Sequence, residues 1–417
     1  MTSSHLAAET AAATLRTTSA IRERAAGLLA RARRGESTWF ALDDTALDAA
    51  AATVAEVTKT RYPSLKIPYH SRWRHFEAGG VDRRAQLDRL LGDVSAAERA
   101  RAQIDLALVS VLLDAGAGPD WRYYEESTQQ TYSRSEGLGL ASWHAFTAGL
   151  FSSDSRHPLQ ADAKGLRAVV ADHLAQAFQV TETNPLIGVQ GRVTLLHRLG
   201  ETMAGNAEVF GAASRPGGLF DALTGPFGPD PAPTAEVSAH DLLSELLASL
   251  SPIWPAQNAI GNIALGDCWR HPAVRGEGLS DGWMPFHKLS QWLTYSLLEP
   301  FEWAGVKVRH LDVLTGLPEY RNGGLLLDAG VLHLKDPALA GRRWHAGDEL
   351  IVEWRALTVA LLDELAPLVR RKLALDEAQM PLACVLEGGT WAAGRVLAQR
   401  LRDGTPPLNI ESDGTVF

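Results

Sequence analysis

The chain has 417 residues, 46% of them hydrophobic, and a formal net charge of −9. This length and composition exclude a disordered chain and suit a globular protein with a sizeable core. The acidic balance argues against general nucleic-acid binding, because contacting many phosphates requires a basic face. A few local Arg and Lys residues would still suffice to hold a single phosphate.

The N-terminal segment and the two cysteines indicate a cytoplasmic protein. Residues 1–35 are Ala-rich with an Arg-rich end and lack the apolar core of a secretory signal. No run of about 18 uncharged apolar residues occurs, so we expect no membrane-spanning segment. Cys268 and Cys384 stand far apart, which fits a reducing compartment and offers neither a disulfide framework nor a cysteine zinc site.

Helical periodicity dominates the predicted secondary structure. Acidic residues at 348–349 and basic residues at 370–372 match the macrodipole of the clearest helix. Pro285 is expected to open the helix predicted at 286–299, and Pro300 to end it. Apolar residues recurring every three or four positions predict helices at 43–60, 96–115, 160–180, 188–210, 238–251, 286–299 and 347–372.

Strand signals are scarce, and the chain is therefore predicted to be mainly α with few short strands. Short pieces such as VKVRHL (306–311) could pair. The stretch 214–236 is rich in Gly and Pro and predicts a long surface loop or a boundary. We accordingly expect an N-terminal helical half, 1–213, and a C-terminal helical half, 237–417, that carries the candidate catalytic residues.

Signatures of several enzyme classes are absent. The chain contains no GxxxxGK[ST], HExxH, GxSxG or kinase pattern. The 13 histidines are scattered, so no local spacing predicts a metal site, and a site assembled from distant segments stays an alternative. We expect the chemistry to use carboxylates, Lys and Arg without a metal.

A dense mixture of cationic and aromatic side chains lies at 67–83. Arg72, Trp73, Arg74, His75 and Phe76 follow one another there. A guanidinium stacked on an indole can grip a planar or anionic ligand. Alternatively, the aromatic side chains pin a loop to the body of the protein and leave its charges in water.

Two charged residues lie among apolar neighbours. Asp105, in RAQIDLALVSVLLDAGAG, is either solvated near a helix start or buried and therefore partnered. Lys288, in WMPFHKLSQWL, either extends its ammonium to water or points it into a cavity.

The segment TGLPEYRNGG (315–324) places Glu319, Tyr320 and Arg321 between two apolar helical stretches. Pro318 and the two glycines are expected to hold an irregular backbone, and irregular segments on a rigid scaffold often bear function. The segment is either a solvated loop or the wall of a pocket.

Four blocks of the sequence are distinctive: YHSRWRHFEAGGVDR, LPEYRNGG, EGGTWAAGR and the ending SDGTVF. They resemble the uracil catabolism protein 4 family, and the likeness covers nearly the whole chain. Members of that family act in a pyrimidine-degradation route that opens the uracil ring while it is attached to ribose phosphate. The resemblance implies a role in this route.

A second set of blocks is LIGVQGRVTLLHRLGE (186–201), PFHKLSQ (285–291), LTGLPEYR (314–321) and GDELIVEWRALTVALLDEL (347–365). These blocks, in the same order, are more distantly similar to the queuosine 5′-phosphate N-glycosylase family. The likeness implies a large helical body related to helix-hairpin-helix DNA-glycosylase folds.

Residue by residue, this likeness places Lys288 on that family's active-site lysine and Glu319 on its catalytic aspartate. Asp348 and Arg355 fall on its Gly-Asp-Arg-x-x-Val-x-Ile-Arg helix. Glu in place of Asp lengthens the arm by a methylene and moves the carboxylate by more than about 1 Å. The base-recognising aromatic residues of that family have no match, so the base side of the substrate must differ.

The two resemblances together imply an N-ribosidic hydrolase that converts ribosylurea 5-phosphate to urea and ribose 5-phosphate without a cofactor. A fixed carboxylate stabilises the positive charge that develops on the sugar. Glu319 would act as base, nucleophile or electrostatic stabiliser, with Lys288 and Asp348 as further catalytic groups. The expected substrate-binding residues are Tyr320, Arg321, Arg355, Arg72, Trp73, Arg74, His75, Phe76 and Asp105.

Other classes of function stay open at this point. The protein could bind a nucleotide-like ligand without cleaving it, as a sensor or scaffold of the same route. It could be a metal-dependent amidohydrolase or deaminase acting on the ureido group, which normally requires a metal-bound water. A hydrolase could also act on an intact pyrimidine nucleotide. The expected partner is a small phosphorylated ribose, and no oligomeric state is predicted.

Overall fold

The computed structural model describes residues 3–114, 116–225, 235–254 and 258–411. The protein is mainly α, as predicted, and its described strands have two or three residues each. The chain divides into two compact units. Unit 1 comprises Met1–His70, Ala256–Gln291 and His310–Phe417, and unit 2 comprises Ser71–Pro255 and Trp292–Arg309.

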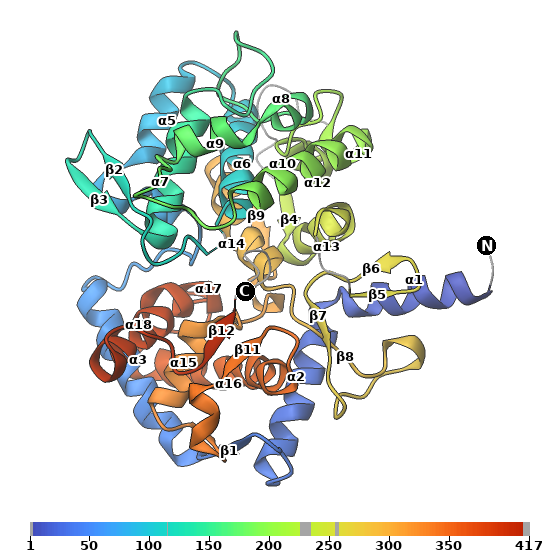
Figure 1. The fold of residues 1–417 in the computed structure, drawn as a ribbon, viewed down its shortest axis with the longest axis vertical. Coiled ribbons are helices and arrows are strands. Elements are labelled where there is room, and N and C mark those ends of the chain that lie inside the picture. The colour runs from blue at the N-terminus through green and yellow to red at the C-terminus, as the bar shows by residue number, and fades with distance from the viewer. Residues whose placement is uncertain (1–2, 115, 226–234, 255–257, 412–417) are drawn as a thin grey trace. The chain divides into compact units, whose positions relative to one another are not determined.

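Unit 1 is built around one long helix, α16 (Glu349–Leu373), whose residues 350–362 are all buried. Burial on every face is typical of a helix at the centre of a core. Figure 1 shows α2 and α3, from the start of the chain, beside α15 and α16 from its last third. The other α-helices that lie wholly in unit 1 are α1 (Ser3–Leu15), α2 (Thr18–Arg33), α3 (Leu47–Arg61), α15 (Tyr320–Asp328), α17 (Leu382–Val385) and α18 (Trp391–Arg402), and a π-helical turn, η7 (Leu386–Thr390), precedes α18.

Unit 2 is built around α6 (Ala96–Leu112), which is buried along most of its length and packs against α7, α10 and α12. Helix α14 (Lys288–Trp303) begins in unit 1 and ends in unit 2. The other α-helices of unit 2 are α4 (Trp73–Phe76), α5 (Arg83–Leu91), α7 (Arg134–Thr147), α8 (Ala163–Ala168), α9 (Ala171–Ala177), α10 (Val189–Ala204), α11 (Ala207–Phe210), α12 (Gly218–Thr224) and α13 (Ala239–Leu250).

The described strands form two-stranded pairs. In the β7–β8 ladder Cys268 pairs with Pro285, and β8 leads the chain towards α14. The antiparallel pairs are β1 (Phe40–Leu42) with β10 (Leu332–Leu334), β2 (Tyr123–Glu125) with β3 (Gln130–Tyr132), β5 (Ala259–Ile260) with β6 (Ile263–Ala264), and β7 (Cys268–Arg270) with β8 (Trp283–Pro285); the parallel pairs are β4 (Glu236–Ser238) with β9 (Lys307–Arg309) and β11 (Arg343–His345) with β12 (Asn409–Glu411).

The helix predicted at 286–299 begins later and runs further than expected. It starts at Lys288, after His287 in the left-handed conformation with φ 49°, and continues through Pro300 to Trp303. Proline has no N–H, so the carbonyl four residues earlier loses its helical partner. The indole N–H of Trp73 donates to that carbonyl, on Ser296, at 3.0 Å. A tertiary hydrogen bond thus replaces the missing helical one.

The helix predicted at 160–180 is two short helices, α8 and α9, because the chain between them is extended at Val169 (φ −66°, ψ 126°). The helix predicted at 188–210 ends at Ala204, and α11 follows it as a separate turn. The predictions at 43–60, 96–115, 238–251 and 347–372 correspond to α3, α6, α13 and α16.

The division into units differs from the predicted boundary at 214–236, because segments from both ends of the chain build unit 1. Residues 215–220 are buried, and α12 lies in this stretch, while 226–234 lies outside the described residues. A Cβ on Gly217 would lie 2.6 Å from the Cβ of Arg101 in α6. Part of the glycine content therefore permits close packing of α12 on α6 and does not mark a boundary.

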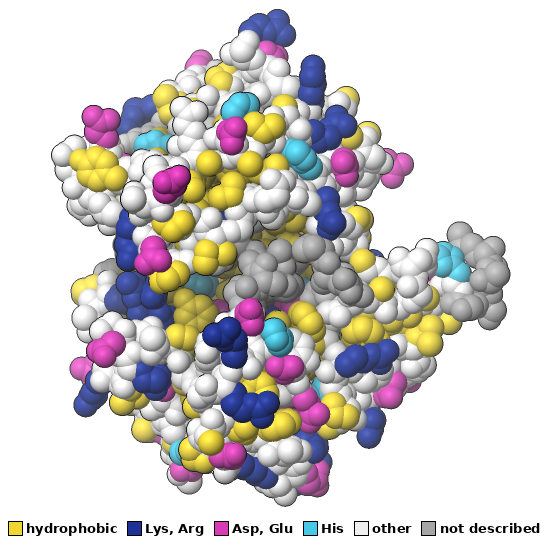
Figure 2. Space-filling model, in the orientation of Figure 1, with side chains coloured by type: hydrophobic (Ala, Val, Ile, Leu, Met, Phe, Trp, Pro, Cys, Tyr) yellow, Lys and Arg dark blue, Asp and Glu magenta, His cyan; other side chains and the backbone are white. Residues whose placement is uncertain are grey.

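The surface shown in Figure 2 intermingles basic and acidic side chains. Among the helices that the structure describes, none combines the length and the apolar composition needed to cross a membrane.

Candidate active site

Glu319 is the N-cap residue of α15. Its Oε2 accepts the backbone N–H of Arg321 and its Oε1 accepts that of Asn322, both at 2.6 Å. A carboxylate in this position is favoured by the unpaired N–H groups and the dipole of the helix. The segment predicted to be an irregular turn is thus the start of a helix, which includes Gly323 and Gly324. The two hydrogen bonds fix the orientation of the carboxylate.

The carboxyl of Glu319 is half-buried, and its burial raises its pKa above the usual value. The N–H groups of Arg321 and Asn322 and the positive charges of Lys288 and His70 act in the opposite direction. Two of the groups that stabilise the ionised form are therefore cationic side chains. The structure brings together Glu319 and Lys288, the two residues on which the predicted chemistry depends most.

Arg355 joins the segments that carry Lys288 and Glu319. Its guanidinium grips Asp267 with two hydrogen bonds of 2.7 and 2.8 Å, and its Nε donates to the carbonyl of Pro318 at 3.2 Å. The backbone N–H of Lys288 donates to the same Asp267 carboxylate at 3.0 Å. Burial would raise the pKa of Asp267, but Arg355 outweighs it and lowers the pKa to about 2. These bonds give Arg355 a positioning role, and its contact with substrate stays a prediction.

Tyr320 and Arg321 lie on the first turn of α15. The Arg321 guanidinium stacks 4.8 Å from the centre of the Tyr320 ring, and its Nη1 donates to the carbonyl of Gly404 at 3.2 Å. Arg321 is buried, and among the described residues none hydrogen-bonds to its Nε. These contacts of Arg321 stabilise the start of α15. Binding of a ligand by Arg321 or Tyr320 stays a prediction.

A glycine on α18 allows this helix to pack against the start of α15. A Cβ at Gly394 would lie 2.1 Å from the carbonyl oxygen of Arg321. We expect Gly394→Ala to lower the free energy of unfolding by about 1–3 kcal/mol, because the two helices must move apart. Urea denaturation measures the effect. Gly27→Ala on α2, where nothing lies within 4 Å of the added Cβ, is the matched control and should stabilise by up to about 1 kcal/mol. Equal stabilities would contradict the expectation.

Asp348 and Asp105 both have carboxylates engaged by the protein. Asp348 is the N-cap residue of α16, and its Oδ2 accepts the N–H of His345 at 2.8 Å. Asp105 is buried in unit 2 and accepts from Arg215 Nε at 2.9 Å and from two backbone N–H groups. Burial nevertheless raises the pKa of Asp105 to about 6. Of the alternatives for Asp105, burial with partners is the one observed. The catalytic role of Asp348 and the substrate contact of Asp105 stay predictions.

The cluster Arg72–Phe76 belongs to unit 2, and most of it forms the short helix α4. Trp73 and Phe76 are buried, with ring centres 5.3 Å apart. These aromatic side chains therefore anchor the segment to the body of unit 2, which agrees with the second of the two alternatives given for this cluster. His75 is half-buried and lies edge-on to the indole of Trp292, 5.7 Å between centres. These rings serve the packing of unit 2.

The arginines of this cluster are not in water, contrary to that same alternative. Arg72 is fully buried and pairs with Asp114 at 3.1 Å, and its Nε donates to Ser110 at 2.6 Å. Arg74 pairs with Glu299 at 2.8 Å. Their charges are neutralised inside unit 2, because a buried cation needs a nearby anion. Ligand contacts of this cluster stay predictions.

His70 and Glu387 form a pair in unit 1 that the sequence analysis did not assign to the site. His70 Nδ1 lies 2.8 Å from Glu387 Oε2. The block EGGTWAAGR contains Glu387, so the family resemblance marked its segment without a role. No sequence signal places His70 beside a residue 317 positions away. Asp267 was likewise missed, since it lies in none of the resembling blocks.

His271, Glu349 and Glu353 could hold a metal ion, because their candidate ligand atoms lie within 4.8 Å of one another. In the structure, His271 Nδ1 accepts the N–H of Ala273 at 3.2 Å, so its Nε2 carries the proton and donates to Glu353 at 3.2 Å. Arg31 lies 3.5 Å from the same carboxylate oxygen. A metal would have to displace this proton next to a cation, so the residues fit a hydrogen-bonded pair better than a metal site.

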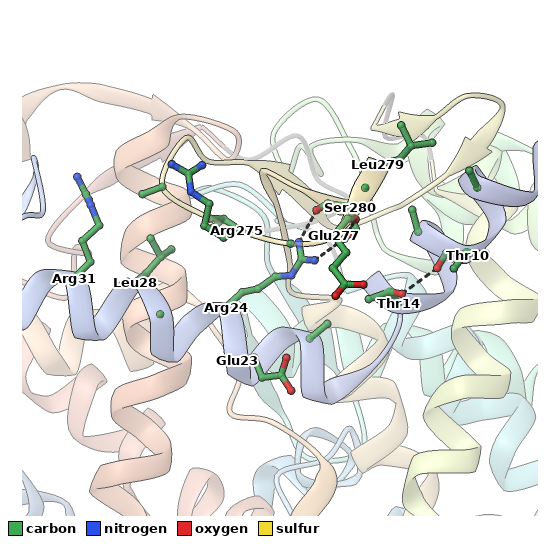
Figure 3. Close-up of a pocket in the computed structure, with 18 of the residues that line it drawn as sticks. Thr10, Thr14, Glu23, Arg24, Leu28, Arg31, Arg275, Glu277, Leu279 and Ser280 are labelled. Atoms are coloured by element: carbon green, nitrogen blue, oxygen red, sulfur yellow. Dashed lines mark hydrogen bonds between the residues drawn. The ribbon is translucent and has the colours of Figure 1, made fainter. Parts of the chain in front are cut away.

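A pocket of about 1000 Å³ lies between α1, α2 and the segment 273–280, all in unit 1 (Figure 3). Figure 3 shows Arg24 reaching across it to Ser280, to which it donates at 2.9 Å. None of the predicted site residues is among the described residues that line it. Its most buried cation is already paired with carbonyl and hydroxyl groups, so size alone does not make this pocket the reaction site.

The fold and site define a mainly helical protein with a helix-capping carboxylate and a lysine positioned by one buried ion pair. The chain belongs to a family of proteins of unknown function, DUF1688, whose model matches residues 14–417. It is similar to Protein urg3 of Schizosaccharomyces pombe, with 40% identity over 407 residues that cover 95% of this chain and 96% of the relative. It is also similar to Uracil catabolism protein 4 of Lachancea kluyveri, with 39% identity over 401 residues that cover 90% of each.

Proposed function

We propose that this protein acts in uracil catabolism as an N-ribosidic hydrolase that converts ribosylurea 5-phosphate to urea and ribose 5-phosphate. The name of the Lachancea kluyveri relative supports the route. The likeness to queuosine 5′-phosphate N-glycosylases supports the class of bond. The observation that carries the proposal is the carboxylate of Glu319, half-buried, fixed by two hydrogen bonds of 2.6 Å and influenced by the charge of Lys288.

The proposed chemistry follows from the charge that develops on the sugar. As the bond between C1′ and nitrogen breaks, the ribose ring becomes cationic, and a carboxylate beside C1′ lowers the energy of that state. Water then adds its oxygen to C1′, and Glu319 takes the proton that this water loses. Lys288 keeps the carboxylate ionised or holds an oxygen of the sugar or phosphate.

Preorganisation makes the carboxylate of Glu319 effective in this role. Its two hydrogen bonds come from backbone N–H groups at the start of α15, so the carboxylate needs no reorientation when the charge appears. The ion pair between Arg355 and Asp267 holds the neighbouring segments at the same time. Each carboxylate oxygen retains a lone pair for the water or the sugar.

One observation favours a second candidate, a metal-dependent amidohydrolase. Glu353 Oε1 is buried and has no hydrogen-bond partner among the described residues. A carboxylate oxygen that binds a metal ion would have this environment when the ion is not bound. The proton on His271 and the nearby Arg31 speak against this reading. The two candidates differ in their products, since an amidohydrolase would release ammonia in place of urea.

A direct assay tests the proposal. Purified protein incubated with ribosylurea 5-phosphate should release urea and ribose 5-phosphate in equal amounts, and prior treatment with a chelator should not reduce the rate. Uridine 5′-monophosphate offered in parallel tests an intact nucleotide as substrate. Release of ammonia without urea would favour the amidohydrolase. Thermal stabilisation by ribose 5-phosphate with no product from any substrate would favour a binding protein.

A further inference from the structure

The π-helical turn η7 presents Glu387 to three side chains of unit 1. Such turns are rare in proteins, and those that occur are often found at functional sites. Glu387 is buried, its Oε1 accepts from Arg61 at 2.8 Å and from the Tyr62 hydroxyl at 2.9 Å, and its Oε2 faces His70 Nδ1 at 2.8 Å. Burial would raise the pKa of Glu387, but His70 and Arg61 outweigh it and lower the pKa to about 2. The carboxylate is therefore ionised under ordinary conditions.

This pairing determines which nitrogen of His70 can react. A carboxylate only accepts hydrogen bonds, so Nδ1 of His70 carries a proton and donates it to Glu387. Within the described part of the chain, no residue hydrogen-bonds to Nε2. The side chain is 11% exposed, so the ring is held inside the protein but is not sealed from a ligand. A histidine oriented through Nδ1 by a carboxylate, with Nε2 available, is an arrangement typical of proton transfer.

The segments that carry Glu387 and Glu319 pack against each other. The turn η7 leads directly into α18, and α18 packs along α15. The two helices approach each other closely at Gly394, where any side chain would meet the carbonyl of Arg321, two residues after Glu319. The positive charge of His70 is also among the influences on the pKa of Glu319. The ring of His70 and the candidate catalytic carboxylate are thus close enough to influence one another within unit 1.

We propose that His70 is the general acid of the reaction and that Glu387 positions its ring. This inference rests on the proposed function. As the bond from C1′ to nitrogen breaks, its electron pair goes to the nitrogen, which receives the proton from His70 Nε2 and leaves as neutral urea. Water adds its oxygen to C1′ and gives a proton to Glu319. That proton returns to His70 through solvent and restores both groups.

The leaving group makes an acid necessary. The anion of urea is a strong base and departs slowly, whereas neutral urea departs readily. A positioned acid contributes about 10²–10⁴-fold to such a step. Glu319 does not supply this proton, because it must be ionised to face the cationic sugar. The reaction therefore needs a second proton-bearing group, and His70 is the residue whose ring is oriented for this role by a carboxylate, that of Glu387.

The test compares two substrates that differ in their need for a proton. β-Ribosyl fluoride 5-phosphate releases fluoride, which departs without a proton and is smaller than urea. We expect His70→Gln to lower kcat/KM for ribosylurea 5-phosphate by about 10²-fold or more and to change fluoride release by less than about threefold. His333→Gln, at an exposed histidine of unit 1, is the matched control and should leave both reactions unchanged.

The outcomes separate this inference from the proposed function. Equal losses with both substrates, or undiminished urea release, in His70→Gln would overturn the assignment of His70 as the acid. Hydrolysis of neither substrate by the unchanged protein would overturn the proposed function itself. Urea denaturation shows whether each variant is folded. Should His70→Gln not fold, Glu387→Gln provides the same comparison, since a neutral amide stabilises the protonated ring less and should produce the same selective loss.

Discussion

Glu319→Gln is expected to lower kcat for urea release from ribosylurea 5-phosphate by about 10³-fold or more, with little change in KM. The amide keeps the length of the side chain but has no negative charge to face the cationic sugar and cannot take a proton from water. The interaction is lost mainly in the transition state, so the effect appears in kcat. Steady-state kinetics with the purified variant measures it.

The role of Glu319 as a helix cap requires a control. Glutamine retains one oxygen for the two N–H groups at the start of α15, and loss of a capping bond costs about 1 kcal/mol of stability. Asp336→Asn makes the same change of carboxylate to amide at an exposed cap, where Oδ1 accepts the N–H of Ala338 at 2.9 Å. It should alter stability similarly and leave the kinetics unchanged.

Glu319→Asp separates charge from reach. Aspartate keeps the charge and caps helices well, but its arm is shorter by a methylene, which retracts the carboxylate by more than about 1 Å. A displacement of this size costs about 10²-fold in rate. The expected order of activity is therefore Glu, then Asp, then Gln. Normal turnover by Glu319→Gln would show that this carboxylate only caps the helix.

The fold could be predicted where the signal is local. Helix α16 has apolar residues on every turn and complementary charges at both ends, and its predicted bounds agree with the structure within a few residues. Helix α14 shows the limit of local reasoning. Its continuation through Pro300 depends on Trp73, whose indole bonds to a carbonyl 223 positions away in the sequence. A rule about proline in isolated helices does not include such a partner.

The candidate site was predictable in part for the same reason. Glu319 and Lys288 lie in blocks that resemble known families, and the structure brings both into one unit. Asp267, which joins their segments, pairs with Arg355 across 88 positions. An aspartate in a short irregular segment is usually a solvated residue, so composition alone gives no reason to select it. Buried ion pairs between distant segments are visible only once the chain is folded.

Lys288→Met is expected to lower the rate at neutral pH by about 10²-fold and to shift the acidic limb of the pH–rate profile to higher pH. Burial raises the pKa of Glu319, and the charge of Lys288 partly counteracts this effect. Removing that charge raises the pKa further. Because the ionised carboxylate is the active form, the rate increases as pH rises through this pKa, and the increase must then occur later.

The other groups that act on Glu319 stay in place in this variant. The N–H groups of Arg321 and Asn322 still donate, so activity should recover in part once the pH exceeds the raised pKa of Glu319. Methionine preserves the apolar stem, and Lys288→Arg, which keeps the charge, should leave the acidic limb near its original position. Profiles of kcat against pH for the three proteins measure the effect. An acidic limb that moves to lower pH would mean that Lys288 does not lower the pKa of Glu319. A higher rate at neutral pH would mean that the protonated carboxyl is the active form, because loss of the cation would then increase the active fraction.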